Sequence, residues 1–299
     1  MKTQLFICAA FAAITASAQT AQFVVTNPQF TGAGSLSEAV QLAEAAVVAG
    51  ADGARIEFDF PEPTQITFDS ELFISLAFDE GLELTIDGGS RVTLSGGGAS
   101  RLFVVDGQRG LFPDPDGPSG QLVLENLTLR DGFSDDTGGA VFTDGTVTIR
   151  NALVLDNRAI VDDDVFVCLF DLLCDGGGAI FVGDYGILLI ENSEFRGNQV
   201  RNGIGDYGGA ISSLGAMAVA NSLFFDNSAG SGGGAIGNAG LAVIYGSRFN
   251  ANFVEDFIGA FDGGGAIQNG GVGSSLSEFQ QLILIDTEFD GNYTVGSGV

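Results

Sequence analysis

The sequence has no histidine and no tryptophan, and its single lysine is Lys2. The remaining positive charge comes from arginines alone, against 38 acidic side chains, and the formal net charge is -27. Nucleic acids and anionic membranes are bound through cationic side chains that meet phosphates, so both are poor candidates as partners. An acidic surface of this kind suits calcium, cationic partners or a saline environment.

Apolar runs are also short, and none reaches the roughly 20 residues that a membrane-spanning helix needs. The first 18 residues read as a secretory signal, with a positive charge at Lys2, an apolar run from Leu5 to Ile14, and small residues at Ala16 and Ala18. The sequence therefore predicts a signal peptide at 1–18 and a mature protein that is secreted or displayed at the cell surface, with no membrane insertion of this chain.

Cysteine is scarce, and beyond the signal only Cys168 and Cys174 remain, six positions apart. In an exported protein this pair predicts a small local disulfide. Metal binding by the pair is a poor alternative, because no histidine or further cysteine pair accompanies it.

Two alternating motifs fill residues 126 to 295. One is Gly-Gly-Ala-(Ile/Val), and the other is a hydrophobic residue followed three positions later by asparagine; an Asn, Gly or Asp stands three positions before each hydrophobic residue. The first motif begins at Gly138, Gly177, Gly208, Gly233 and Gly264, and the second comprises Val154/Asn157, Phe195/Asn198, Phe224/Asn227, Phe249/Asn252 and Phe289/Asn292. The steps from Asn126 to Asn151 and from Asn221 to Gly246 are both 25 residues, so a coil of about 25 residues is the repeating unit.

Each unit contains short β-prone runs punctuated by glycine and asparagine, as in Ile187 to Ile190. Equivalent strands of successive units should pair in parallel, and the crossovers that this pairing requires are overwhelmingly right-handed. The expected fold is an all-β, right-handed parallel β-helix, which is a solenoid. The phenylalanines should stack in its interior, and the asparagines should occupy turns, tolerate left-handed backbone and bond the equivalent amide one coil away.

The N-terminal part of the mature chain predicts a cap on this solenoid. Ser35 and Glu38 form a capping box, and apolar residues from Leu36 to Val47 follow at helical spacing, so a helix here would cover the open first coil. Strands are expected next, the third of them ended by the turn Asp87-Gly88-Gly89; they are Ile56–Phe58, Ile66–Phe68, Leu82–Ile86 and Val92–Leu94. The expected organisation is a signal peptide at 1–18, an N-terminal cap and first coils at 19–110, and repeat coils of the same β-helix at 111–299.

The alternating motifs of residues 126 to 295 resemble the repeats of polymorphic outer membrane proteins. The stretch from Thr26-Asn27 through Gly34-Ser35-Leu36-Ser37-Glu38-Ala39 is similar to the N-terminal segment of exported β-helix proteins, with Gly34 and Ser37 where cysteine and arginine are usual. The resemblance implies export, association with a cell surface or outer membrane, and a role in adhesion to a glycan or protein of a neighbouring or host cell.

Enzymes that act on polysaccharides use the same fold, which is also called pectin lyase-like, so catalysis must be judged on residues. Glycoside hydrolysis needs converging carboxylates, and lyase chemistry on polyuronates needs cations and a strong base. The mature chain offers neither lysine nor histidine, and Arg130, Arg150, Arg158 and Arg196 do not share one repeat column. We therefore assign no catalytic residue and expect a binding scaffold; the alternative is a polysaccharide lyase or glycoside hydrolase working through an acidic pair such as Asp135 and Asp136.

Calcium is the one cofactor that the acidic residues suggest. Asp114 and Asp116 give an alternating acidic spacing, and Asp162, Asp163 and Asp164 form a second cluster. Neither matches a complete calcium loop, and plain solvated turns are the alternative interpretation.

Most insertions follow the motif asparagine and precede the next Gly-Gly pair, at Arg158–Gly176, Gln199–Tyr207 and Phe253–Gly263. Because they share one phase of the coil, they should emerge along one edge of the solenoid. Their apolar residues, with Phe166, Phe170, Phe257 and Phe261 foremost, predict a binding edge. The alternative is that these loops pack on one another and on the flank of the solenoid.

The last motif, from Phe289 to Asn292, is followed by Tyr293 to Val299, where a further Gly-Gly strand is expected. A solenoid end without a cap exposes unpaired backbone groups and an open core. We expect either a truncated copy of a longer exported protein or a last coil that pairs with a partner, including a second copy of itself.

Overall fold

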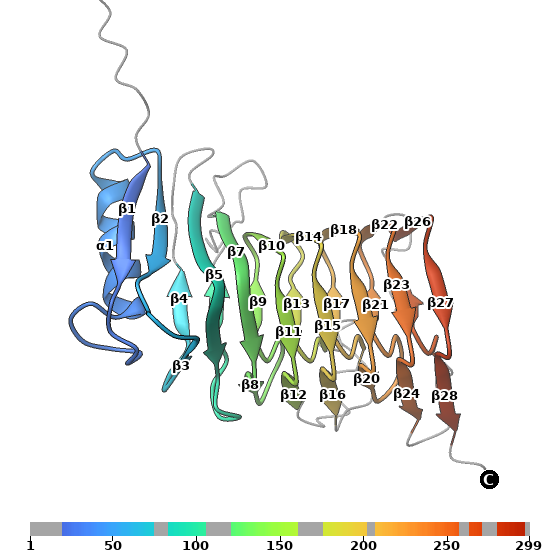
Figure 1. The fold of residues 1–299 in the computed structure, drawn as a ribbon. Coiled ribbons are helices and arrows are strands. Elements are labelled where there is room, and N and C mark those ends of the chain that lie inside the picture. Colours follow the sequence, from blue (N-terminus) through green and yellow to red (C-terminus); the bar gives the residue numbers. More distant parts are fainter. Residues whose placement is uncertain are drawn as a thin grey trace, which may run out of the picture.

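The structure is a computed structural model that describes residues 20–74, 83–105, 121–160, 176–201, 207–256, 263–270 and 280–296. These residues form a parallel β-helix with one helix at its N-terminal end (Figure 1). The predicted fold class is confirmed, because the strand pairs of the described residues are parallel and link successive coils. The predicted signal peptide at 1–18 lies outside the described residues.

Most of the strands belong to one long sheet, which has 15 strands in the described part of the chain. Each coil from β10 onward contributes two short strands to it, separated by a corner of two residues. The strands of the long sheet are β1 (Ala21–Val25), β2 (Gly53–Phe58), β3 (Thr64–Thr67), β5 (Glu83–Ser95), β7 (Gln121–Arg130), β10 (Thr146–Arg150), β11 (Leu153–Leu155), β14 (Ile187–Glu191), β15 (Glu194–Arg196), β18 (Ala216–Ala220), β19 (Leu223–Phe225), β22 (Leu241–Tyr245), β23 (Arg248–Asn250), β26 (Gln281–Ile285) and β27 (Glu288–Asp290).

Two smaller sheets complete the coil. The six-stranded sheet, as described, follows the long sheet along the chain and contains β8 (Phe133–Ser134), β12 (Arg158–Ile160), β16 (Gln199–Arg201), β20 (Ser228–Ala229), β24 (Phe253–Asp256) and β28 (Tyr293–Gly296). The seven-stranded sheet, as described, leads back to the long sheet and contains β4 (Leu72–Ile74), β6 (Phe103–Val105), β9 (Val141–Thr143), β13 (Ile180–Val182), β17 (Ile211–Ser213), β21 (Ile236–Asn238) and β25 (Ile267–Asn269).

The strand register follows the sequence motifs. Phe224 lies opposite Phe195 on one side and Phe249 on the other, as the repeat predicted. The Asn126 to Asn151 step of 25 residues joins two equivalent positions, whereas the Asn157 to Asn198 step is 41 residues because an insertion intervenes. The repeat unit is therefore confirmed as a coil of the solenoid, and the longer step marks a coil that carries an insertion.

The predicted aromatic column forms in the interior. Ring centroids are 4.9 Å apart between Phe195 and Phe224 and 4.7 Å apart between Phe224 and Phe249, and these rings are fully buried. Such burial contributes roughly 2 to 3 kcal/mol per ring. Phe289 is an exception to the prediction: it stacks on Phe249 at 5.1 Å but is 46% exposed, because it lies on the edge strand β27.

The motif asparagines form a buried ladder along the solenoid. In Asn227 the amide oxygen accepts hydrogen bonds from the backbone N–H and the side-chain amide of Asn198, at 3.0 and 2.9 Å. Its own amide nitrogen donates to the carbonyl of Phe195 and to the amide oxygen of Asn252. The predicted amide contact between coils is confirmed, and it satisfies backbone groups that would otherwise be buried without partners.

The left-handed residues lie elsewhere than predicted. The ladder asparagines are not left-handed; the residue before each of them is, as in Asp156, Asp226 and Ala251, with φ of 52°, 56° and 54°. A second left-handed column lies at the corner within the long sheet and comprises Asn126, Asn151, Asn192, Asn221, Gly246 and Asp286, with φ between 48° and 57°. The ladder asparagine is reserved for hydrogen bonding because its neighbour makes the turn.

The paired glycines permit close approach of two backbones, because a Cβ at either position would clash. Gly208 has a φ of +72°, and a Cβ on Gly209 would lie 2.2 Å from the carbonyl oxygen of Gly234. Any larger residue at either position would force neighbouring coils apart.

Helix α1 (Leu36–Val48) covers the first coil, as predicted. The Oγ of Ser35 accepts a hydrogen bond from the backbone N–H of Glu38 at 3.2 Å, and the Glu38 carboxylate accepts one from the N–H of Gly34 at 2.5 Å. The buried face of α1, which includes Leu36, packs on β1 and β2.

One local prediction is wrong. The turn Asp87-Gly88-Gly89 does not end a strand, because β5 continues through it and shifts register against β7 between Asp87 and Val92. The extra residues bulge out at positive φ, 56° at Gly89 and 60° at Ser90.

The left-handed alanine at position 251 leads to the first prediction. A non-glycine residue in this conformation costs roughly 1 to 2 kcal/mol, which exceeds the roughly 0.5 to 1 kcal/mol entropy cost of glycine. Ala251→Gly should therefore raise the free energy of unfolding by up to about 1 kcal/mol in denaturant titrations. Ala218→Gly, at an exposed position of β18, should lower it by a similar amount. A loss of stability in both variants would contradict the left-handed conformation of Ala251.

Candidate binding groove

The alternative acidic pair, Asp135 and Asp136, is exposed and does not line the groove described below, whereas the other sequence-predicted site residues lie outside the described residues. This applies to the binding-edge candidates Phe166, Phe170, Phe257 and Phe261, to the calcium candidates Asp114, Asp116, Asp162, Asp163 and Asp164, and to Cys168 and Cys174. Of the insertions themselves, the structure places the first residues: Arg158 and Gln199 pair with each other in the six-stranded sheet, and Gln199 pairs with Ser228, the partner of Phe253. The three insertions therefore begin in one column.

The outer face of the long sheet carries a groove with a volume of about 1150 Å³. It lies at the corner between the two strands that each coil contributes, and it extends from Ser90 on β5 to Asp290 on β27. Seven strands spaced by about 4.8 Å give it a length of roughly 29 Å. The sequence motifs did not identify this groove, although they had marked the corner residues as a repeated column.

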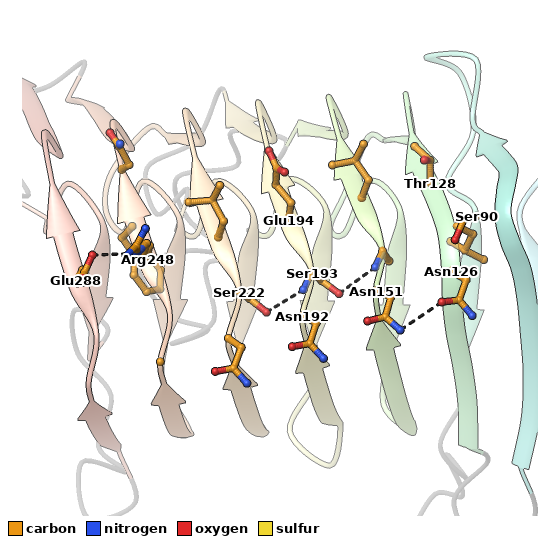
Figure 2. A pocket seen from close by; sticks show the side chains of 18 of the residues that line it. Ser90, Asn126, Thr128, Asn151, Asn192, Ser193, Glu194, Ser222, Arg248 and Glu288 are labelled. Carbon is orange, nitrogen blue, oxygen red and sulfur yellow. Dashed lines mark hydrogen bonds and ion pairs between the residues drawn. The ribbon is translucent and has the colours of Figure 1, made fainter.

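The floor of the groove is a column of hydroxyl groups that complete the backbone hydrogen bonding of the corner (Figure 2). Ser193 accepts from the N–H of Ala152 at 3.2 Å and donates to the carbonyl of Glu191 at 2.8 Å, and Ser222 repeats this arrangement one coil later. Both serines are 4% exposed. Their role is structural, since their hydrogen-bonding capacity is largely used within the corner.

The left-handed asparagines lie on the exposed side of this corner. Asn126 donates to Asp87 at 2.9 Å and accepts from Asn151 at 3.2 Å (Figure 2). Asn192 and Asn221 are exposed, and their amides have no hydrogen-bonding partner among the described residues. Each of these two amides therefore presents donors and an acceptor to solvent in the groove.

Arginines at the groove are paired with glutamates. Arg248 binds Glu288 at 2.9 Å across neighbouring strands, and Arg150 binds Glu191 at 3.2 Å beside the groove. Arg196 pairs with Glu194 on its own strand and also lies over the ring of Phe225, at 5.1 Å from the centroid. Arg130 and Arg196 do share a column, separated by Leu155, although the four arginines considered from the sequence do not.

The carboxylates of the groove are spread along it. Glu194 and Glu288 belong to one column and are separated by three strand spacings, about 14 Å. Carboxylate pairs of glycosidases lie within roughly 9.5 Å. Only Glu288 and Asp290, two residues apart on β27, are near each other among the carboxylates that line the groove, and Glu288 is paired with Arg248.

A cluster of ion pairs lies at the N-terminal end of the groove. Arg55 binds Glu57 at 3.0 Å, Glu125 at 2.9 Å and also Asp87. Burial alone would raise the pKa of Asp87, but hydrogen bonds from Asn126 and the N–H of Gly89, with the Arg55 charge, hold this pKa below its ordinary value. The same cluster raises the pKa of Arg55 despite its burial. Asp87 thus anchors Asn126, the first asparagine of the corner column.

Within the described ranges, no group of three or more histidine, cysteine or acidic side chains is placed to hold a metal ion. The described helix is also too short to cross a membrane.

No family model matches the chain. An 84-residue stretch, 28% of this chain, is 34% identical to the metabotropic glutamate receptor-like protein R of Dictyostelium discoideum. The match spans 5% of that protein's length, so it is a local similarity.

The lowered pKa of Asp87 predicts a pH-dependent contribution to stability. This contribution is present above the ordinary carboxyl pKa near 4 and is lost as the pH falls through the lower value of the folded state. Asp87→Asn should therefore be less stable than the parent at neutral pH, and the difference should shrink at about pH 3 in urea titrations. Glu57→Gln removes an exposed partner of the same arginine and should change little at either pH. A difference that grows on acidification would be incompatible with a lowered pKa.

Proposed function

We propose that this protein is an exported, non-catalytic binding scaffold of adhesin-like function, and that its ligand lies along the groove of the long sheet. The observation that carries this proposal is the distribution of polar groups in the groove. They recur coil by coil over its length, and the two exposed amides occupy adjacent coils. A site of this shape suits an extended ligand that contacts several coils at once.

The alternative function is a polysaccharide lyase or hydrolase. The pair Glu288 and Asp290 is the feature of the groove that favours it, because these are the two lining carboxylates that lie close in the chain. Against it, Glu288 is ion-paired, and the chain contains no histidine and no lysine after Lys2 to act as a base or to hold an acidic sugar. Binding without turnover is therefore the function that we favour.

Export to the cell surface and association with an outer membrane are part of this proposal and rest on the sequence of residues 1–18 and on the repeat resemblance. The apolar insertions, with Phe166, Phe170, Phe257 and Phe261, and the calcium candidates stay predictions. They would add a second contact edge and stabilising ions to the scaffold.

A bulky side chain in the groove should block the ligand. Leu223 faces the groove from β19, and Leu223→Trp should reduce retention of fluorescent protein on cells and polysaccharide films by about tenfold or more. Val24→Trp is the matched control, because Val24 is 54% exposed on β1, away from the groove. Turnover of a polysaccharide that disappears in the double variant Glu288→Gln/Asp290→Asn would establish the enzymatic alternative instead.

A separate prediction concerns self-association. Strands β26, β27 and β28 lie at the edges of their sheets, and Phe289 and Tyr293 are 46% and 49% exposed there. Residues 19–299 should therefore form dimers or larger species in analytical sedimentation, and an added capping coil should make them monomeric. A monodisperse monomer of residues 19–299 would contradict pairing through this edge.

A further inference from the structure

We infer that the ligand of the groove is a neutral glycan chain, bound through the amides of Asn192 and Asn221 and through the apolar strip beside them. This inference rests on the proposed function and specifies its ligand. Three observations carry it: the chemistry of the exposed amides in the groove, the pairing of the arginines in and beside it, and the apolar side chains on the strands that precede the corner.

The two amides are free to bind a polyol. Asn192 and Asn221 stand in adjacent coils, so their amides recur at about the strand spacing of 4.8 Å. Asparagine occurs in this column because it tolerates the left-handed backbone. The fold does not need its amide, since Gly246 occupies the same position one coil later with a φ of +57°. An amide offers both donors and an acceptor, which is what an alcohol group, itself donor and acceptor, requires.

The arginines argue against an anionic ligand. Arg248, Arg196 and Arg150 are each engaged by a glutamate, so a uronic acid or sulfate would have to displace a carboxylate that is already bound. The net charge of -27 adds long-range repulsion of any polyanion. A neutral chain meets neither obstacle.

The outer face of the long sheet carries an apolar strip on the strands that precede the corner, although Glu191, paired with Arg150, directly precedes Asn192. From β14 to β26, the outward positions form the column Leu189, Ala218, Val243 and Ile283, and Tyr245 directly precedes the corner residue Gly246. Leu189, Tyr245 and Ile283 are 36%, 47% and 44% exposed. Pyranose rings combine an apolar C–H face with hydroxyl groups at the rim, so this strip and the adjacent amides match the two surfaces of one sugar chain.

The experiment uses a variant that removes the amides and keeps the backbone. Asn192→Gly/Asn221→Gly preserves the left-handed corner, because glycine adopts this conformation readily and Gly246 already does so. Asp226→Gly is the matched control, since Asp226 is an exposed left-handed residue that does not line the groove.

The probes are neutral oligosaccharides (gluco-, manno-, xylo- and N-acetylglucosamine oligomers), oligogalacturonate, and a cationic peptide, measured by glycan array and calorimetry. We expect at least one neutral oligomer to bind. The double glycine variant should weaken this binding roughly tenfold, which corresponds to two lost hydrogen bonds, and Asp226→Gly should leave it unchanged. Tyr245→Ala should weaken it as well.

Several results would overturn the inference: binding of oligogalacturonate or the cationic peptide alone, binding of a neutral oligomer that the double glycine variant leaves intact, or no binding of any probe. If none of the oligomers binds while Leu223→Trp still abolishes retention on cells, the proposed scaffold function stands and the neutral-glycan ligand is wrong.

Discussion

The buried ladder of asparagine amides is the interaction on which the rest of the structure depends. A ladder residue inside the column, such as Asn227, joins three coils through hydrogen bonds to the amides on either side and to the carbonyl of Phe195. Because an amide offers donors and an acceptor together, the pattern can continue from coil to coil. The ladder also fixes register, and register places the phenylalanine rings over one another and the outer corner residues in a single column.

Asparagine has two different roles in each coil, one in the interior of the solenoid and one on its outer surface. Asn198 and Asn227 are fully buried and fully engaged, whereas Asn192 and Asn221 lie six residues earlier in each coil and keep their amides exposed. The difference comes from the corner within the long sheet, where serine hydroxyls, not asparagine amides, complete the backbone hydrogen bonds. The groove is thus a consequence of the repeat, and the amides exposed in it are groups that the fold does not need for its own hydrogen bonding.

The sequence predicted the solenoid because its strongest signals are local and repeated. The spacing of Phe224 and Asn227 identified the coil, and Ser35 with Glu38 identified the cap. The sequence did not reveal that the residue before each ladder asparagine is left-handed. That column contains aspartates and glycines but also Ala251, a residue that rarely adopts this conformation. The groove was missed for a different reason: the motifs marked the corner residues as a column, but they did not show that the corner leaves a hollow between the two strands of each coil. The aromatic candidates and the calcium candidates lie outside the described residues, so the structure does not test them.

The side-chain amide resonances of the asparagines test this account most directly. Isotope-labelled protein should show slow hydrogen exchange for the amides of Asn157, Asn198, Asn227 and Asn252, because they are buried in the ladder. The amides of Asn192 and Asn221 should exchange fast and should be the ones that shift when a neutral oligosaccharide is added. Equal exchange in both columns, or shifts confined to the ladder, would contradict the division between an inner column that holds the fold and an outer column that binds.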